Sequence, residues 1–357
     1  MKKHNFNSGP SILPQEVLDQ AAQAILNFNN IGLSLLEIGH RTPWFVEVLE
    51  EAQGLVKELM QLDNEYEVLF LHGGATTQFM QVPMNLLDKE DTAAYCDNGT
   101  WGTKAMQEGS YFGNSILAAS SKDKNYTYIN KGFEIPAGSK YLHITTNNTV
   151  EGTQFHVLPS TGDTPLIADM SSDIFSRPLD FSKFSLMYAG AQKNMGAASV
   201  SLVVIKKAIL GKIKQGIPPI MDYQKHIEAH SLMNTPPVFA VYTSLLTLRW
   251  IKKEGGLVEM ERRSLEKSAL LYSTIDSLPL FTTHVAREDR SHMNAVFNLA
   301  NQDLEAPFLE LCKKEEMIGV KGYRTVGGIR VSMYNALPLE SVQAFCDMAK
   351  YFAVKHG

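Results

Sequence analysis

The chain has few cysteines and scattered histidines, without a CxxC pair or an HExxH motif. Its three cysteines, Cys96, Cys312 and Cys346, lie far apart and form no CxxC pair. This spacing argues against a disulfide framework and against a structural zinc site, and it fits a reducing cytoplasm. The 10 histidines are scattered and form no HExxH motif, so we expect no metal ion to be bound.

Long apolar runs and a strong excess of charge are also absent. No segment approaches the apolar length that a membrane helix needs, and the start, residues 1–7, has no apolar core after its basic residues. With 33 basic and 38 acidic residues, the formal net charge is -5. A chain of this charge is not generally attracted to nucleic acid or to acidic membranes. We therefore expect a cytoplasmic protein without nucleic-acid or membrane partners, in which any anion is bound locally.

Length and periodicity predict an α/β fold with two domains. The chain has 357 residues, more than a single core usually serves, and 44% of them are hydrophobic. Over the first two thirds, short β-rich runs alternate with helical periods, which is typical of a mainly parallel sheet covered by helices. The break at Gly255–Gly256 predicts a large domain at 16–256. The smaller α/β C-terminal domain would comprise 257–357 together with the N-terminal segment 1–15.

Particular elements can be predicted from local patterns. One helix is expected to open at Thr42–Pro43, with Phe45, Leu49, Ala52, Val56 and Leu59 on its buried stripe. Strands are expected at 67–71, 92–96, 141–145, 166–168, 185–188 and 200–205, and in the second domain at 293–299 and 329–333. Ligands of open parallel sheets bind outside the carboxyl ends of the strands, so the residues that follow each strand are candidates for function.

Two of these strand ends offer a phosphate site and an aromatic plate. After Leu71, the stretch 72–79 (HGGATTQF) passes directly into a helical pattern and exposes backbone N–H groups to an anion such as phosphate. Its glycines could also serve packing alone. After 92–96, Trp101 lies in a polar turn flanked by glycines. Its indole could stack on a flat ring or fold back onto the core.

A carboxylate and an amine follow the next two strands. Asp169 ends an apolar run, and a buried carboxylate needs a partner, usually a helix cap or a salt bridge. Lys193 lies 193 − 169 = 24 residues further on, about one strand-to-strand unit away, within the small-residue stretch YAGAQKNMG. It could be a solvated lysine in a turn, or a partly desolvated amine that acts as a nucleophile. An amine, a carboxylate, a phosphate site and an aromatic plate are together what pyridoxal phosphate requires.

Over nearly its whole length, the chain resembles the phosphoserine aminotransferases, in class V of the fold type I pyridoxal-phosphate enzymes. The similar stretches are 5–10, 39–41, 72–79, 97–102, 148–152, 168–172, 188–196, 234–237, 322–330 and 334–335. The resemblance implies a large domain with a mainly parallel central sheet and a smaller α/β C-terminal domain. It also implies one pyridoxal phosphate per subunit, in a Schiff base with Lys193, and a homodimer with shared active sites.

The resemblance further implies roles for individual residues. Asp169 would bind the pyridine nitrogen, with Trp101 stacked on the ring and Thr149 at its hydroxyl side. The residues that would hold the phosphate are Ala75, Thr76 and Gln192, with Asn234 and Thr235 reaching the phosphate of the neighbouring subunit. Arg330 would clamp the α-carboxylate of the substrate, and its distal anion would meet Arg41, His40 and Arg324.

Two positions depart from the family pattern. Relatives often have glycine in place of Ala75 and arginine or serine in place of Thr76. Backbone contacts to phosphate survive such changes, whereas a side-chain charge directed at the distal anion is lost. Surface ion pairing is the alternative role for any of the arginines.

The implied reaction is a ping-pong transamination. Glutamate would give up its amino group and leave as 2-oxoglutarate, and 3-phosphohydroxypyruvate would accept the group and leave as O-phosphoserine, a step of serine biosynthesis. The resemblance also allows 3-hydroxy-2-oxo-4-phosphooxybutanoate, on the route to pyridoxine. The alternatives are another class V enzyme, of the alanine-glyoxylate aminotransferase or cysteine desulfurase type, and a cofactor-binding protein without turnover. A desulfurase needs a reactive cysteine on a loop, and Cys312 lies in a helical pattern.

Overall fold

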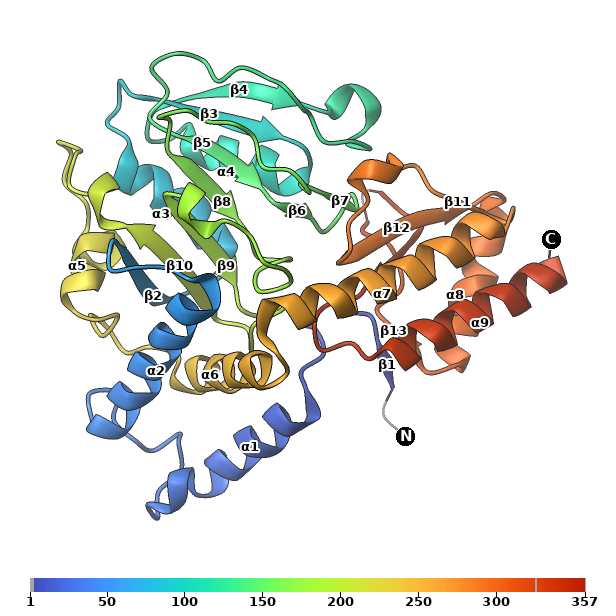
Figure 1. Ribbon diagram of the computed structural model, residues 1–357, viewed down its shortest axis with the longest axis horizontal. Helices are drawn as coiled ribbons and strands as arrows, with labels where there is room; N and C mark the ends of the chain where they lie inside the picture. The colour runs from blue at the N-terminus through green and yellow to red at the C-terminus, as the bar shows by residue number, and fades with distance from the viewer. Residues whose placement is uncertain (1–2, 325, 357) are drawn as a thin grey trace.

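The computed structural model describes residues 3–324 and 326–356. Figure 1 shows a larger body built on a central sheet and a smaller body that contains most of the C-terminal third of the chain. The helices are α1 (Gln15–Leu26), α2 (Pro43–Met60), α3 (Ala75–Leu86), α4 (Thr100–Gly109), α5 (Tyr223–Glu228), α6 (Val238–Lys253), α7 (Gly256–Ser277), α8 (Glu305–Lys314) and α9 (Leu339–His356). The strands are β1 (His4–Asn5), β2 (Tyr66–His72), β3 (Thr92–Asp97), β4 (Asn114–Ser120), β5 (Leu142–Thr145), β6 (Asn147–Asn148), β7 (Thr153–Gln154), β8 (Leu166–Asp169), β9 (Leu186–Gly190), β10 (Val200–Lys206), β11 (Phe281–Thr282), β12 (Asn294–Leu299), β13 (Met317–Ile318) and β14 (Ile329–Ser332).

The central sheet is mainly parallel, as the sequence predicts. Among the described residues, its strand order is β2-β10-β9-β8-β5-β3-β4. The pairs from β9 to β4 are parallel, whereas β10 runs antiparallel to both of its neighbours, β2 and β9. Every residue of β5, β8 and β9 is buried, because helices cover both faces of the sheet. The carboxyl ends of these three strands therefore meet at one edge.

Two helical layers enclose the sheet and leave this edge accessible. On one face, α1, α2 and α6 pack around a large apolar core, and on the other face α3, α4 and α5 pack around a second core. The predicted helix at Thr42–Pro43 is α2, in which Phe45 and Val56 are completely buried. It ends where Gln61 adopts a left-handed conformation, with φ of 53°. The first turns of α3 and α4 lie directly after β2 and β3, at the edge that carries the candidate residues.

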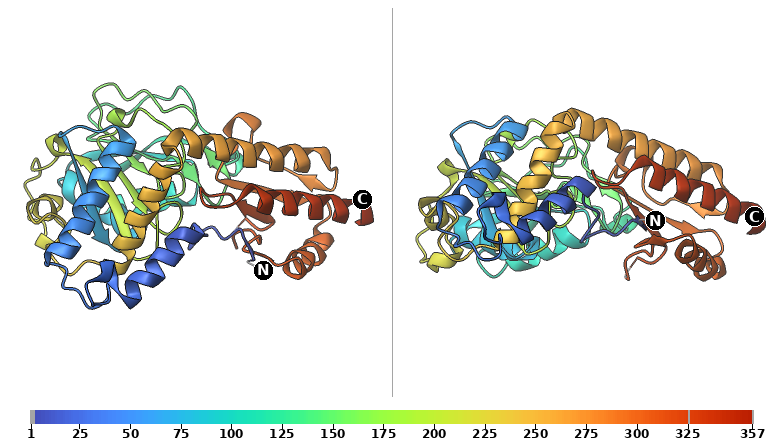
Figure 2. Two further views of the ribbon diagram at one scale, coloured as in Figure 1. Left: turned by 60° about the horizontal axis from the view of Figure 1, so that its bottom comes forward. Right: turned by 90° about the horizontal axis from the view of Figure 1, so that it is seen from below.

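The smaller body has a core of its own. There β11, β12 and β14 form an antiparallel sheet against which α7, α8 and α9 pack. The N-terminal β1 pairs in parallel with β13, so that Phe6 is buried in this core. In Figure 2, α7 extends from the larger body along the smaller one. Its start contributes Leu257 to the large core and its end contributes Leu271 to the small core.

Within residues 3–324 and 326–356, no helix is long and apolar enough to cross a membrane. The same residues contain no group of three or more His, Cys, Asp or Glu side chains that could hold a metal ion.

Candidate active site at the carboxyl edge of the sheet

A cavity of about 120 Å³ lies at the carboxyl ends of β5, β8 and β9. It is lined by Gly74, Ala75, Thr76, Trp101, Thr145, Asn147, Thr149, Asp169, Ser171, Ser172, Gln192 and Lys193. Seven of the residues singled out in the sequence are among these twelve. They come from five separate segments, which the parallel sheet brings together because its strands end at the same edge.

Lys193 follows β9 and lies inside this cavity, partly buried. Its Nζ donates a hydrogen bond to Thr149 Oγ1 at 2.7 Å and lies 6.0 Å from the centre of the Trp101 ring. Burial lowers the pKa of the amine from 10.5 to about 8; Asp169 opposes this shift and the positive charge of Arg330 adds to it. A neutral amine, which is the nucleophilic form, is therefore accessible close to neutral pH.

Asp169, the last residue of β8, is 4% exposed. Its Oδ1 accepts hydrogen bonds from Ser171 N at 2.9 Å and from Ser171 Oγ at 2.6 Å. Burial raises the pKa of this carboxyl group, and the Ser171 hydrogen bonds and the charge of Lys193 oppose the shift. A cation placed against the carboxylate in the cavity would stabilise its charged form further.

The first turns of two helices complete the wall. Gly74 is the N-cap of α3, so the N–H groups of Ala75 and Thr76 belong to the first turn and have no acceptor within the helix. They can bind an anion, which the helix dipole also favours. Trp101 lies in the first turn of α4, and its buried Nε1 has no hydrogen-bond partner among the described residues. Its ring is tilted against the ring of Phe79, with the two centroids 6.4 Å apart. The indole is partly buried at the cavity.

The N-terminal segment packs against Lys193, a contact that the sequence patterns did not reveal. Ser11 N donates to the carbonyl of Gln192 at 2.9 Å, and Ser11 Oγ donates to the carbonyl of Lys193. Gly9 has a φ of 137°, and a Cβ atom at this position would lie 3.3 Å from Cγ of Lys193. Glycine is therefore favoured here by the backbone conformation, and the close approach of Lys193 leaves little room for a larger side chain.

Arg330, on β14, is 8% exposed and forms no ion pair with the described carboxylates. Its Nη2 donates to Ser8 Oγ at 2.7 Å, while its buried Nε has no hydrogen-bond partner within residues 3–324 and 326–356. Burial lowers the pKa of the guanidinium, and the neighbouring Tyr334, Tyr323 and Glu151 oppose that shift. A buried guanidinium with free donors is well suited to bind a carboxylate in the planar, two-pronged manner.

The remaining predicted residues lie apart from the cavity. His40 and Arg41 precede α2; His40 is half-buried with a free Nε2, and burial, assisted by Arg41, lowers its pKa. Arg324 is exposed in the loop before β14. Asn234 and Thr235 lie between α5 and α6, where burial lowers the pKa of His72 and the backbone of Thr235 opposes that shift. None of these five side chains lines the cavity among the described residues.

Sequence reasoning missed four polar lining residues: Thr145, Asn147, Ser171 and Ser172. Each follows or ends β5 or β8, so the rule that pointed to Asp169 could have found them. Thr145 lies opposite Asp169 across the β5–β8 pair, and no described residue forms a hydrogen bond with its buried hydroxyl.

Comparison with known proteins identifies the family. The Aminotransferase class-V family model matches residues 3–345. This chain belongs to the class-V aminotransferases. A phosphoserine aminotransferase of Flavobacterium johnsoniae is 54% identical over 351 residues, which are 98% of each chain. The resemblance to phosphoserine aminotransferases is thereby confirmed.

Solved structures of this class-V family have the same fold. Phosphoserine aminotransferase from Bacillus circulans subsp. alkalophilus superposes with a TM-score of 0.97 at 39% identity, covering 100% of this chain and 99% of the other. The PLP-bound enzyme from Trichomonas vaginalis gives a TM-score of 0.92 at 33% identity, covering 98% and 100%. The fold type I architecture expected from the sequence is confirmed by these class-V structures.

The residues present fit pyridoxal phosphate. The buried carboxylate of Asp169 suits the protonated nitrogen of a pyridine ring, since such a partner would offset the cost of its burial. The first turn of α3 suits the phosphate, and the partly buried amine of Lys193 suits an aldehyde.

Proposed function

We propose that this chain is a phosphoserine aminotransferase that transfers the amino group of L-glutamate to 3-phosphohydroxypyruvate. The products would be 2-oxoglutarate and O-phospho-L-serine. The observation that carries the proposal is the single cavity in which the amine of Lys193 faces Thr149 and Trp101 and shares its electrostatic environment with Asp169. Relatives with this activity in their names, such as the 51% identical protein of Bacteroides thetaiotaomicron, support the choice of substrates.

Six residues of the cavity would hold the cofactor. Trp101 would lie against the ring, Asp169 would bind the ring nitrogen, and Thr149 the ring hydroxyl. The amides of Ala75 and Thr76, with the Gln192 side chain, would bind the phosphate. When bound, pyridoxal phosphate supplies a ring that accepts the electrons left on the substrate's α-carbon after deprotonation.

Lys193 would bind the cofactor covalently and then act as the proton carrier. Its Nζ would take the proton from the α-carbon of glutamate and return a proton at the end of the same half-reaction. A pKa of about 8 suits this task, because both protonation states are populated near neutral pH. The ionised carboxylate of Asp169 would lie next to the ring nitrogen and would keep that nitrogen protonated and positively charged during the reaction.

Arginines would select the substrates. Arg330 would bind the α-carboxylate that glutamate and 3-phosphohydroxypyruvate have in common. The distal group is a carboxylate in one substrate and a phosphate in the other, and His40, Arg41 and Arg324 would meet both, because guanidinium groups bind either anion.

A homodimer would complete this site. In the described part of one chain, His40, Arg41, Asn234 and Thr235 do not line the cavity, which is consistent with a site shared between two subunits. We propose that the partner supplies these residues, with Asn234 and Thr235 at the cofactor phosphate. We also propose a cytoplasmic location and the domain division into 16–256 and 257–357 with 1–15.

The same site would accept 3-hydroxy-2-oxo-4-phosphooxybutanoate, which also combines an α-keto acid with a distal phosphate. A desulfurase is disfavoured, because Cys312 is completely buried in α8 and burial raises its pKa to about 12. The likeness to an alanine–glyoxylate aminotransferase of Nostoc, at 17% identity and a TM-score of 0.78, extends to the fold alone.

A substrate panel tests the proposal. The purified protein, supplied with pyridoxal phosphate, is assayed for 2-oxoglutarate with glutamate and each of three acceptors: 3-phosphohydroxypyruvate, its unphosphorylated analogue hydroxypyruvate, and glyoxylate. We expect turnover with the first acceptor and a strong preference over hydroxypyruvate, because the distal phosphate carries binding energy. Equal rates with all three acceptors, or alanine formation from cysteine, would contradict the proposal.

A further inference from the structure

The larger and smaller bodies are joined beside the cavity by buried amide side chains. Asn147, on β6, lines the cavity and is 2% exposed, while Asn294, at the start of β12, is completely buried. Asn147 Nδ2 donates to Ser172 Oγ and to Asn294 Oδ1, both at 2.8 Å. One amide of the cavity wall therefore holds one amide of the smaller body.

From Asn294 the hydrogen bonds continue to the guanidinium of Arg330. Asn294 Nδ2 donates to Ser332 Oγ at 2.9 Å and to Tyr334 Oη at 3.2 Å. The Tyr334 hydroxyl in turn donates to the carbonyl of Ser8 at 2.8 Å, and Ser8 Oγ accepts the hydrogen bond of Arg330 Nη2 at 2.7 Å. We call this series, Asn147–Asn294–Tyr334–Ser8–Arg330, the inner path.

Hydrogen bonds and burial fix the side chains of the inner path relative to one another. Asn294 uses both amide hydrogens and its oxygen, and Tyr334 is 1% exposed. The β12–β14 register places Asn294 opposite Ser332 and Val296 opposite Arg330. A shift of Asn294 therefore shifts the strand that carries Arg330, and breaking any link leaves a buried polar group without a partner.

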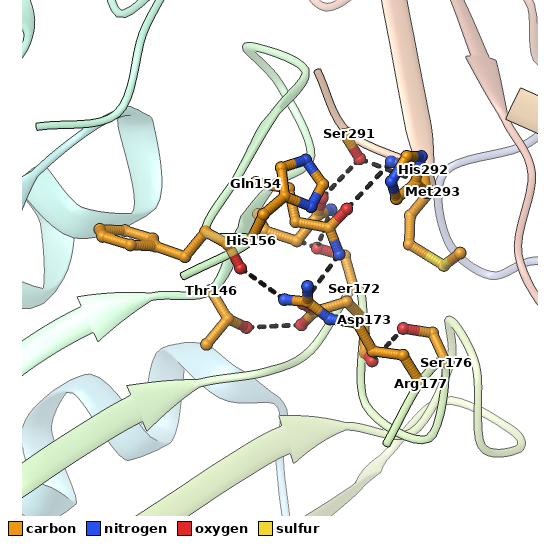
Figure 3. Close-up of polar contacts among 12 residues, drawn as sticks. Thr146, Gln154, His156, Ser172, Asp173, Ser176, Arg177, Ser291, His292 and Met293 are labelled. Atoms are coloured by element: carbon orange, nitrogen blue, oxygen red, sulfur yellow. Dashed lines mark hydrogen bonds and ion pairs between the residues drawn. The ribbon is translucent and has the colours of Figure 1, made fainter. Parts of the chain in front are cut away.

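A second set of contacts crosses between the bodies without reaching the cavity. Figure 3 shows Gln154 between Asp173 and His292, with Arg177 next to Asp173. Gln154 Nε2 donates to Asp173 Oδ2 at 3.2 Å, and His292 N donates to Gln154 Oε1 at 3.0 Å. His292 Nδ1 then contacts Ser268 Oγ, on α7, at 2.9 Å. None of these residues lines the cavity, so this outer path provides a matched control.

We propose that Asn294 and Tyr334 are positioning residues, which set the Arg330 guanidinium at the distance from Lys193 that the substrate's α-carboxylate and α-amine require. The inference rests on the proposed function, because it assigns Arg330 to the substrate carboxylate. Asn294 and Tyr334 hold Arg330 through Ser8 and do not themselves bind the cofactor. They consequently affect substrate affinity more than cofactor affinity.

The test is a double-mutant cycle of Asn294→Ala and Tyr334→Phe, with Ser268→Ala as the control on the outer path. For each holoenzyme we would measure KM and kcat for glutamate, the affinity for pyridoxal phosphate by absorbance, and the Tm. The binding of glutarate, which has both carboxylates but no amino group, would be followed by calorimetry. Since a misplacement of about 1 Å can cost on the order of a hundredfold, we expect each inner-path variant to raise KM and the glutarate Kd about tenfold or more.

We expect the double variant to bind substrate as tightly as whichever single variant has the lower substrate affinity, because both substitutions break the same path. Cofactor affinity should remain within about threefold of the wild type, and Ser268→Ala should leave KM unchanged. The proposal is overturned if the inner-path variants lower only the Tm, or if their effects on KM add independently. It is also overturned if cofactor affinity falls as much as substrate affinity does. If wild-type protein itself fails to react with glutamate, the proposed function is wrong instead.

Discussion

Replacing Arg330 should weaken substrate binding severely while leaving the fold nearly as stable as before. The guanidinium is buried, its Nε is free, and no carboxylate among the described residues pairs with it. Two charge-assisted hydrogen bonds to the substrate carboxylate contribute about 1.5 to 3 kcal/mol each. Together these amount to about 3 to 6 kcal/mol, and since about 1.4 kcal/mol corresponds to a factor of ten, Arg330→Met should raise KM for glutamate on the order of 10² to 10⁴-fold.

The effect on stability should be small, because two contributions oppose each other. Arg330→Met loses the hydrogen bond to Ser8, but it also removes a buried cation whose lowered pKa shows that burial penalises its charge. We expect the free energy of unfolding of the cofactor-free protein to change by no more than about 1 kcal/mol.

Steady-state kinetics with glutamate and urea unfolding of the same preparations give both quantities. Arg262→Met is the matched control, because Arg262 is exposed and already paired with Glu259 and Glu266. A rise in KM below about tenfold would refute the carboxylate assignment of Arg330. If Arg330→Met lowers the free energy of unfolding by several kcal/mol, the buried charge of Arg330 does not destabilise the folded protein as argued above.

Three further outcomes follow from the site and its surroundings. Asp169→Ala should lower the rate of the glutamate half-reaction by at least about a hundredfold in single-turnover measurements. The control variant Asp180→Ala, at an exposed position, should react at the wild-type rate. Equal rates for the two variants would show that Asp169 has no role in the mechanism. Buried Lys267, which donates to the carbonyls of Tyr334 and Leu337, has a pKa lowered to about 7 from 10.5. Because the unfolded state holds this proton more tightly, the stability of the wild type relative to Lys267→Met should rise with pH between about 7 and 10, by at most about 1.4 kcal/mol per pH unit, and a flat or falling difference in urea unfolding would contradict the shift. Cys312 should react with a thiol reagent only on unfolding, since burial raises its pKa to about 12, and rapid labelling by mass spectrometry would reopen the desulfurase alternative.

The sequence predicts most of the sheet because its strands are buried on both faces. β8, β9 and β10 are mostly apolar, and β5 has Leu142 and Ile144 next to polar residues; each is expected within a few residues of its observed bounds. β4 was not predicted, since it is a partly exposed edge strand of mixed composition, NSILAAS. The antiparallel direction of β10 was not predicted either, because direction depends on pairing and leaves no trace in the composition of a buried strand.

Part of the candidate site can also be predicted from the sequence, and part of it cannot. Asp169, Trp101 and Lys193 each follow a strand of the parallel sheet, so the position of a residue after its strand predicts its place in the cavity. The approach of Gly9 to Lys193 and the link from Ser8 to Arg330 join segments more than 180 residues apart, and only the folded chain reveals them. The roles of His40, Arg41, Arg324, Asn234 and Thr235 remain predictions, because they depend on a second subunit or on bound substrate.

The central claim is that Lys193 is the amine through which this cavity handles amino groups, and an absorbance spectrum tests it most directly. Protein loaded with pyridoxal phosphate is recorded before glutamate, after glutamate, and again after 3-phosphohydroxypyruvate, in parallel with Lys193→Ala. We predict a visible absorption band that disappears with glutamate, returns with the phosphorylated keto acid, and is absent or insensitive to both in the variant. A band that ignores glutamate, or one that responds equally in Lys193→Ala, would contradict the account.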